Sequence, residues 1–202
     1  MITLGLTGSI AMGKSTAATH FRRQGVRVYD ADATIHKMLN RGGCAVSTVN
    51  QAFPGVALDG IIDRKALGDL VFSDKKALTT LESILHPLVK AKEIKFLKKA
   101  NRDHQNLVVL EIPLLFETER QSEYDFVACV SSPPFIQYCR AMRRANMTLE
   151  KFKFICKNQL PNSEKCQRSD FIIHSGLSKS FSLKIVQQII AKIRKKGIIK
   201  NA

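Results

Sequence analysis

The chain has 202 residues, 45% of them hydrophobic, and a formal net charge of +15. This length suits one domain with a small inserted lobe, and no apolar run approaches the roughly 18 residues of a membrane span. The five cysteines contain no C-x-x-C pair, which argues against a disulfide framework and a zinc site. The first residues read as a core strand and not as a signal peptide, so we expect a cytoplasmic protein. We favour a monomer and leave the oligomeric state open.

Most of the positive charge lies in the C-terminal third of the chain. Residues 131–202 carry 15 basic and 3 acidic side chains, whereas residues 61–130 carry 11 of each. A basic third attracts polyanions, which could be nucleotide phosphates, nucleic acid or counterions of the solvent.

The first predicted elements are a buried strand over residues 2–7, a glycine-containing loop, and a helix over residues 15–24. The loop matches the phosphate-binding pattern G-x-x-x-x-G-K-[ST] from residue 8 to residue 15. Its glycines let the backbone approach a phosphate, Lys14 reaches the β- and γ-phosphates, and Ser15 binds Mg²⁺. The residues predicted to bind the nucleotide are Gly8, Ser9, Ile10, Ala11, Met12, Gly13, Lys14, Ser15 and Thr16.

A second short strand over residues 27–30 ends in two aspartates, Asp30 and Asp32, and a helix follows to about residue 40. In an open parallel sheet, ligands bind outside the carboxyl ends of the strands, so both carboxylates are expected near the phosphate loop. One could accept a hydroxyl proton and the other could support Mg²⁺. Alternatively, both cap the helix, which explains Asp30 better than Asp32.

Residues 44–105 are predicted to be mostly helical, without a convincing strand. Asp59-Gly60 is a turn signal, and Asp63 is a good N-cap for a helix over residues 64–72. A second helix is expected to about residue 85, and His86-Pro87 to start a third that reaches about residue 100. This stretch is too long for one crossover, so it predicts an inserted lobe for a second substrate.

Three further strands are predicted over residues 107–112, 126–130 and 170–174, with helices over 135–145, from Thr148, and over 180–195. Five strands alternating with helices predict an α/β fold with a parallel sheet covered on both faces. Glu111 ends the third strand, where it either supports Mg²⁺ or faces solvent. Arg140 and Arg144 are four residues apart on one helix, so they could clamp a phosphate together or form an exposed basic face.

These features combine into a pattern that resembles the dephospho-coenzyme A kinases. The histidine-proline pair and the Pro-Leu-Leu-Phe-Glu run are more specific than the phosphate loop, which marks only a large superfamily. The matching segments are Leu6–Thr16, Asp30–Asp32, Asp63–Leu67, Leu85–Leu88, Pro113–Glu117, Gln137 with Arg140 and Arg144, Gln159–Pro161, Glu164–Lys165 and Ser169–Ile173.

The resemblance implies a P-loop kinase-like, three-layer αβα fold with a five-stranded parallel sheet. It implies a nucleotide-binding core over 1–32, 106–112, 124–132 and 168–202, a helical acceptor lobe over 33–105, and a helical lid over 113–123 and 133–167. Three departures stand out: Ser9 and Ala11 replace frequent glycines, Ile155 replaces a usual arginine, and Ser169 and His174 replace a usual alanine and a usual asparagine.

The implied reaction transfers the γ-phosphate of ATP to the 3′-hydroxyl of dephospho-coenzyme A, with Mg²⁺ as cofactor. The resemblance makes Asp32 the base that accepts the hydroxyl proton. Further catalytic residues are Lys14, Arg140 and Arg144, and the metal residues are Ser15 and Glu111. The residues expected on the acceptor side are Asp32, Arg64, His86 and Glu117. Two alternatives remain open: a P-loop kinase for another small hydroxyl acceptor, and a nucleotide-gated nucleic-acid-binding protein. Against the second, the sequence has no aromatic-rich stacking platform.

Overall fold

The computed structural model describes residues 1–200, with side chains except those of Ser73 and residues 196–200. The chain forms two compact units: unit 1 comprises Met1–Tyr29 and the chain from Ala100 onward, and unit 2 comprises Asp30–Lys99. The last two residues of the predicted core, 201–202, lie outside the described residues. Within the described part, no helix combines the length and the apolarity needed to cross a bilayer.

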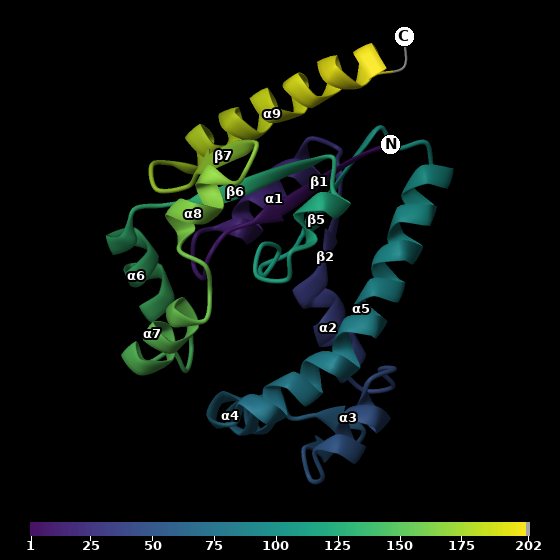
Figure 1. Ribbon diagram of the computed structural model, residues 1–202, viewed down its shortest axis with the longest axis vertical. Coiled ribbons are helices and arrows are strands. Elements are labelled where there is room, and N and C mark those ends of the chain that lie inside the picture. The colour runs from purple at the N-terminus through teal and green to yellow at the C-terminus, as the bar shows by residue number, and fades with distance from the viewer. Residues whose placement is uncertain (201–202) are drawn as a thin grey trace. The chain divides into compact units, whose positions relative to one another are not determined.

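The central sheet has five strands in the order β2-β5-β1-β6-β7. Strand β1 pairs in parallel with β5 and β6, and β6 pairs in parallel with β7 (Figure 1). The predicted five-stranded α/β fold is therefore confirmed. The strands are β1 Ile2–Thr7, β2 Arg27–Asp30, β5 Leu107–Glu111, β6 Phe126–Ser131 and β7 Phe171–His174.

Two helices, α1 (Lys14–Arg23) and α9 (Lys179–Lys200), cover one face of this sheet. Their apolar side chains form one buried cluster with the strands, and the fully buried members include Leu4, Leu6 and Phe21. On the other face of β1, a Cβ on Gly5 would lie 2.6 Å from Leu115 Cδ1, so the segment after β5 packs directly on the backbone there.

The remaining elements of unit 1 follow β5 and flank the carboxyl edge of the sheet. Helix α8 packs against β6 and α9 against β7 (Figure 1). Thr148 caps α7, as predicted, by accepting a hydrogen bond from the Lys151 N–H at 3.2 Å. These elements are the 3₁₀ helix Arg120–Glu123, α6 Pro134–Met142, α7 Leu149–Lys157 and α8 Asn162–Gln167.

Unit 2 is mainly helical, but the expectation that it has no strand is wrong. Strands β3 (Ala57–Leu58) and β4 (Ile61–Ile62) pair in antiparallel fashion around Asp59 and Gly60. Both turn residues have positive φ, 49° and 76°, which two-residue hairpin turns require. Strands of two residues are too short to show alternation in a sequence. The helices of unit 2 are α2 Ala31–Leu39, α3 Val46–Ala52, α4 Arg64–Ser73 and most of α5 Lys75–Arg102.

The predicted break at His86-Pro87 is also wrong, because α5 continues through Pro87. A proline inside a helix costs about 3 kcal/mol, since it cannot donate a hydrogen bond to the carbonyl four residues earlier. Leu85 and Val89 are 7% and 8% exposed on either side of it. Burying two such side chains contributes roughly 1.5–3 kcal/mol each, which together matches or exceeds the cost of the proline.

Helix α1 carries a buried histidine that makes folding sensitive to acid. His20 is 3% exposed, and its Nε2 lies 3.2 Å from Ser182 Oγ of α9. Burial lowers the pKa of His20 below its usual 6.5, and the nearby Arg23 and Lys179 lower it further. The unfolded chain therefore binds the proton more readily than the folded chain, so stability is lost as the pH falls below about 6.5 and through the folded pKa.

We expect the thermal midpoint of the protein to fall more steeply from about pH 7.5 to about pH 5 than that of His20→Gln, whose side chain does not titrate. His36→Gln is the matched control because His36 is exposed on α2, and it should keep the steep fall. Equal slopes for the protein and His20→Gln would show that His20 does not carry this acid sensitivity.

Candidate active site

The loop between β1 and α1 has the backbone conformation of a phosphate-binding loop. Gly8 and Gly13 have φ values of 142° and 96°, which side chains of L-residues rarely adopt. A Cβ on Gly8 would lie 2.6 Å from the carbonyl oxygen of Val130, so β6 also requires a glycine there. Ala11 takes a φ of 58°, at a cost of roughly 1–2 kcal/mol. The loop thus accommodates alanine at this position by a strained backbone.

The polar groups expected to bind phosphates lie where the loop ends and α1 begins. The Lys14 ammonium donates a hydrogen bond to the Gly8 carbonyl at 2.7 Å and lies 3.5 Å from the Ser9 carbonyl. Ser15 is exposed in the first turn of α1, where N–H groups have no acceptor within the helix. A helix start with these N–H groups and a lysine attracts an anion such as a nucleotide phosphate.

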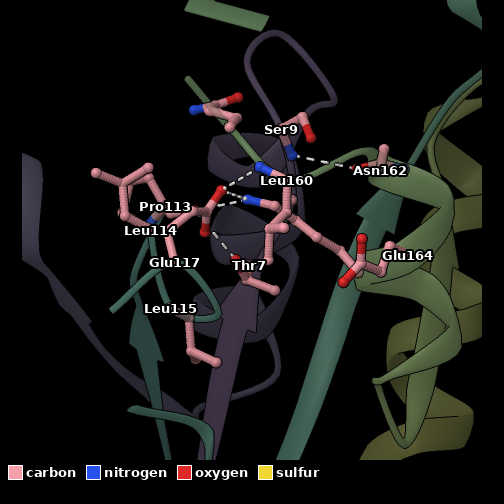
Figure 2. Close-up of polar contacts among 12 residues, drawn as sticks. Thr7, Ser9, Pro113, Leu114, Leu115, Glu117, Leu160, Asn162 and Glu164 are labelled. Atoms are coloured by element: carbon pink, nitrogen blue, oxygen red, sulfur yellow. Dashed lines mark hydrogen bonds and ion pairs between the residues drawn. The ribbon is translucent and has the colours of Figure 1, made fainter. Parts of the chain in front are cut away.

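Three side-chain amides hold the first half of the loop from the outside. Asn162 Oδ1 accepts a hydrogen bond from the Ser9 N–H at 3.2 Å (Figure 2). Gln159 Oε1 accepts one from the Ile10 N–H at 2.9 Å. Gln137 Nε2 donates to the Ile10 carbonyl at 3.0 Å. The predicted lid segment therefore fixes the position of the loop backbone.

Arg140 lies at the opposite end of the loop. Its Nη1 and Nη2 donate to Ser175 Oγ at 3.0 Å and to the Ser175 carbonyl at 2.6 Å. Ser175 Oγ in turn donates to the Met12 carbonyl at 2.5 Å, so the guanidinium is held beside the loop. The expectation that Arg140 and Arg144 share one helix face is wrong, because α6 ends at Met142. Arg144 is exposed in the turn that follows it.

The two candidate metal residues carry oxygen ligands of the kind that a divalent cation takes. Glu111 is the last residue of β5 and 5% exposed, and it is in register with Leu6, two residues before Gly8. Carboxylate and hydroxyl oxygens are the ligands that Mg²⁺ prefers, so the chemistry of Glu111 and Ser15 fits that ion.

Glu117 anchors the chain around Leu160 and Lys165 through a buried ion pair. Its Oε1 lies 2.6 Å from Lys165 Nζ and accepts a hydrogen bond from the Leu160 N–H at 2.9 Å (Figure 2). Lys165 is fully buried and also donates to the Pro113 carbonyl at 3.2 Å. Glu117 is thereby a positioning residue for the segment that holds the loop; the acceptor-side role expected from the sequence stays a prediction.

Breaking this pair should destabilise unit 1. Lys165→Met is expected to lower the free energy of unfolding by about 3–5 kcal/mol, because it leaves the Glu117 carboxylate buried without its cation. Urea denaturation measures this loss. The exposed pair of Arg168 and Glu164, with 3.4 Å between Nη1 and Oε1, provides the control: Glu164→Gln should cost less than about 1 kcal/mol. Equal losses in the two variants would contradict the structural role of Lys165.

A pocket of about 540 Å³ adjoins the Glu117 anchor. Its lining mixes an aromatic ring, two carboxylates, two cations and the uncharged residues 158–161, and Arg168 stacks over the Phe116 ring at 4.9 Å. Such a lining suits a ligand that carries both anionic and hydrogen-bonding groups. The lining residues are Phe116, Glu117, Glu119, Lys157, Asn158, Gln159, Leu160, Pro161 and Arg168.

Unit 2 carries the remaining predicted site residues. Asp30 is the N-cap of α2, since its Oδ1 accepts a hydrogen bond from the Ala33 N–H at 2.8 Å. Asp32, in the first turn of the same helix, is exposed, and so are Arg64 at the start of α4 and His86 within α5. The two aspartates thus differ: Asp30 is the helix cap and half-buried, whereas Asp32 is an exposed residue of the first turn.

Two residues that contact the loop were missed at the sequence level. Asn162 contacts Ser9 across 153 positions, and Ser175 contacts Met12 across 163 positions. Asn162 follows the recognised Gln159–Pro161 segment, and that adjacency was the one signal that could have indicated it. Ser175 carries no local signal, because its role depends on the fold.

Most of this chain matches known proteins. The family model for dephospho-CoA kinase matches residues 2–179. The chain is 53% identical over 165 residues to a dephospho-CoA kinase of Paramagnetospirillum magneticum, covering 82% of this chain and 78% of that one. It is 44% identical to one of Rhizobium meliloti, covering 96% and 99%.

A solved structure agrees with these relatives. The dephospho-CoA kinase of Campylobacter jejuni superposes with a TM-score of 0.70 at 28% identity, over 96% of this chain and 98% of that chain. The phosphate loop, its lysine and the sheet topology lie within the region that matches the family. The chain therefore belongs to the dephospho-CoA kinase family.

Proposed function

We propose that this protein transfers the γ-phosphate of ATP to the 3′-hydroxyl of dephospho-coenzyme A and releases coenzyme A and ADP. The observation that carries the proposal is the phosphate loop with Lys14 Nζ 2.7 Å from the Gly8 carbonyl, in a chain of this family. The reaction leaves the protein little covalent work, because phosphoryl transfer depends mainly on positioning and charge stabilisation.

Within this proposal, the loop N–H groups and Lys14 bind the β- and γ-phosphates. Arg140, held beside the loop by Ser175, stabilises the negative charge that spreads over the transferred phosphoryl group. Ser15 and Glu111 would hold Mg²⁺, which neutralises phosphate charge when it is bound. Arg144, exposed after α6, joins the phosphates when the lid closes.

Asp32 is the proposed base for the acceptor hydroxyl. Its exposure in the first turn of α2, beside an Asp30 that is engaged as the N-cap, supports this choice. Arg64, His86 and Glu117 are proposed on the acceptor side, with the pocket beside Glu117 taking part of that substrate. Five free cysteines agree with a cytoplasmic protein, since thiols stay reduced there. We propose that the protein acts as a monomer.

The product identifies the reaction. With Mg-ATP and dephospho-coenzyme A, mass spectrometry should detect one added phosphate, and a phosphatase specific for 3′-phosphate monoesters (a 3′-nucleotidase) should remove it. Phosphate added at another hydroxyl, or on no part of the acceptor, would contradict the proposal.

A further inference from the structure

Two cysteines from different elements meet beside the phosphate loop. The Sγ atoms of Cys129 on β6 and Cys166 on α8 lie 3.6 Å apart, although 37 positions separate them in the chain. Cys129 is fully buried, whereas Cys166 is partly exposed. The phosphate-transfer reaction uses neither thiol, so the pair has no part in the function proposed above.

Asn162 connects this cysteine pair to the loop. It lies one helical turn before Cys166 in α8, and its Nδ2 is 3.6 Å from the Cys166 sulfur. The sulfur of Cys129 lies 3.8 Å from Asn162 Oδ1, the atom that accepts the hydrogen bond from the Ser9 N–H (Figure 2). Nδ2 also donates to Ser131 Oγ at 3.0 Å. Any shift of α8 toward β6 therefore moves the atom that holds the loop.

We propose that a peroxide oxidises Cys129 and Cys166 to an intramolecular disulfide, and that this bond weakens nucleotide binding by displacing Asn162 from Ser9. In the first step, the thiolate of one cysteine attacks the peroxide to give a sulfenic acid and water. In the second step, the other thiol displaces that hydroxyl as a second water, and the sulfur–sulfur bond forms. Two thiols and one hydrogen peroxide thus yield one disulfide and two waters.

The environments of the two thiols decide which one reacts first. Burial raises the pKa of the Cys129 thiol well above its usual range, and the neighbouring Cys166 raises it further. Cys129 therefore stays protonated and is closed to solvent, whereas Cys166 is the partly exposed member of the pair. Cys166 forms the sulfenic acid, and Cys129 resolves it.

The bond requires a movement at the loop. A disulfide has a sulfur–sulfur length of about 2.05 Å, so the two atoms must approach by roughly 1.5 Å from their present 3.6 Å. Because β6 lies inside the sheet, α8 makes the larger movement and carries Asn162 with it. The hydrogen bond from the Ser9 N–H to Asn162 Oδ1 is already 3.2 Å long, so such a shift breaks it.

The test measures Mg-ATP binding to the full chain before and after graded hydrogen peroxide, by calorimetry. This experiment measures nucleotide binding without any acceptor, so its result does not depend on whether dephospho-coenzyme A is the substrate. If the reduced protein did not bind Mg-ATP at all, the proposed function itself would be contradicted. We expect oxidation to weaken binding about fivefold, the scale of one hydrogen bond, and a dithiol reductant to restore it. Peptide mapping should find Cys129 and Cys166 linked, with loss of two hydrogen atoms.

Two variants of the pair and one control variant separate its oxidation from general thiol oxidation. Cys166→Ser should keep reduced-state binding and lose the peroxide effect, and Cys129→Ala should lose it too. Cys44→Ser removes an exposed cysteine of unit 2 and should respond to peroxide like the unaltered protein. Any of three results would overturn the proposal. The first is a disulfide between other cysteines, the second is a Cys129–Cys166 disulfide that leaves nucleotide binding unchanged, and the third is a loss of binding by Cys166→Ser on peroxide treatment equal to that of the unaltered protein.

Discussion

Replacing Lys14 by alanine should lower kcat for phosphoryl transfer by about 10³-fold, the upper end of the loss when one preorganised donor to a transition state is removed. The Lys14 ammonium lies at the mouth of the loop, 2.7 Å from the Gly8 carbonyl, where the β- and γ-phosphates of the proposed reaction bind. Nucleotide binding should weaken less than turnover, because the loop N–H groups remain. Steady-state kinetics and calorimetry of the same preparations separate these two effects.

Lys184→Ala is the matched control, because it removes the same charge from an exposed position on α9. It should leave kcat unchanged. The thermal midpoint of Lys14→Ala should stay within a few degrees of that of the protein, because the side chain is only partly buried. Near-normal turnover by folded Lys14→Ala would exclude the lysine from the reaction.

Asp32→Asn should lower kcat by at least about 10²-fold, since loss of a general base typically costs 10²–10⁴-fold. The amide has almost the size of the carboxylate but cannot accept the hydroxyl proton. The Michaelis constant for ATP should change little, because the base acts on the acceptor. Initial rates at saturating concentrations of both substrates measure the effect.

Asp30→Asn supplies a sharp control two positions away. Asparagine caps helices as well as aspartate does, so the hydrogen bond from the Ala33 N–H should survive. This variant should keep kcat within a few-fold and keep its thermal midpoint. If Asp30→Asn loses as much turnover as Asp32→Asn, the base assignment between the two aspartates is wrong.

The central sheet and the phosphate loop could be predicted from the sequence because both depend on local pattern. Strands buried on both faces, such as β5, appear as uninterrupted apolar runs, and Leu107, Val108, Val109 and Leu110 are all buried. The loop was recognisable because its glycine positions are set by backbone geometry: Gly8 and Gly13 have positive φ.

Other features could not be predicted because they depend on contacts between distant residues. Pro87 indicates a helix boundary by itself, yet the burial of Leu85 and Val89 keeps α5 continuous. Lys165 belongs to a recognised motif, but its charge alone favours exposure; only the fold brings Glu117 within 2.6 Å of it. The amide of Asn162 gains its role in the same way, across 153 positions.

ADP release with Mg-ATP, in the presence and absence of dephospho-coenzyme A and beside a panel of nucleosides and sugar acids, separates the proposed kinase from its alternatives. We expect release that depends on dephospho-coenzyme A and exceeds the release with every other acceptor. Release stimulated by another acceptor and not by dephospho-coenzyme A would contradict it, and would keep a P-loop kinase with a different substrate. No stimulation by any acceptor, from protein that binds ATP and nucleic acid, would replace the kinase by a nucleotide-gated nucleic-acid-binding protein.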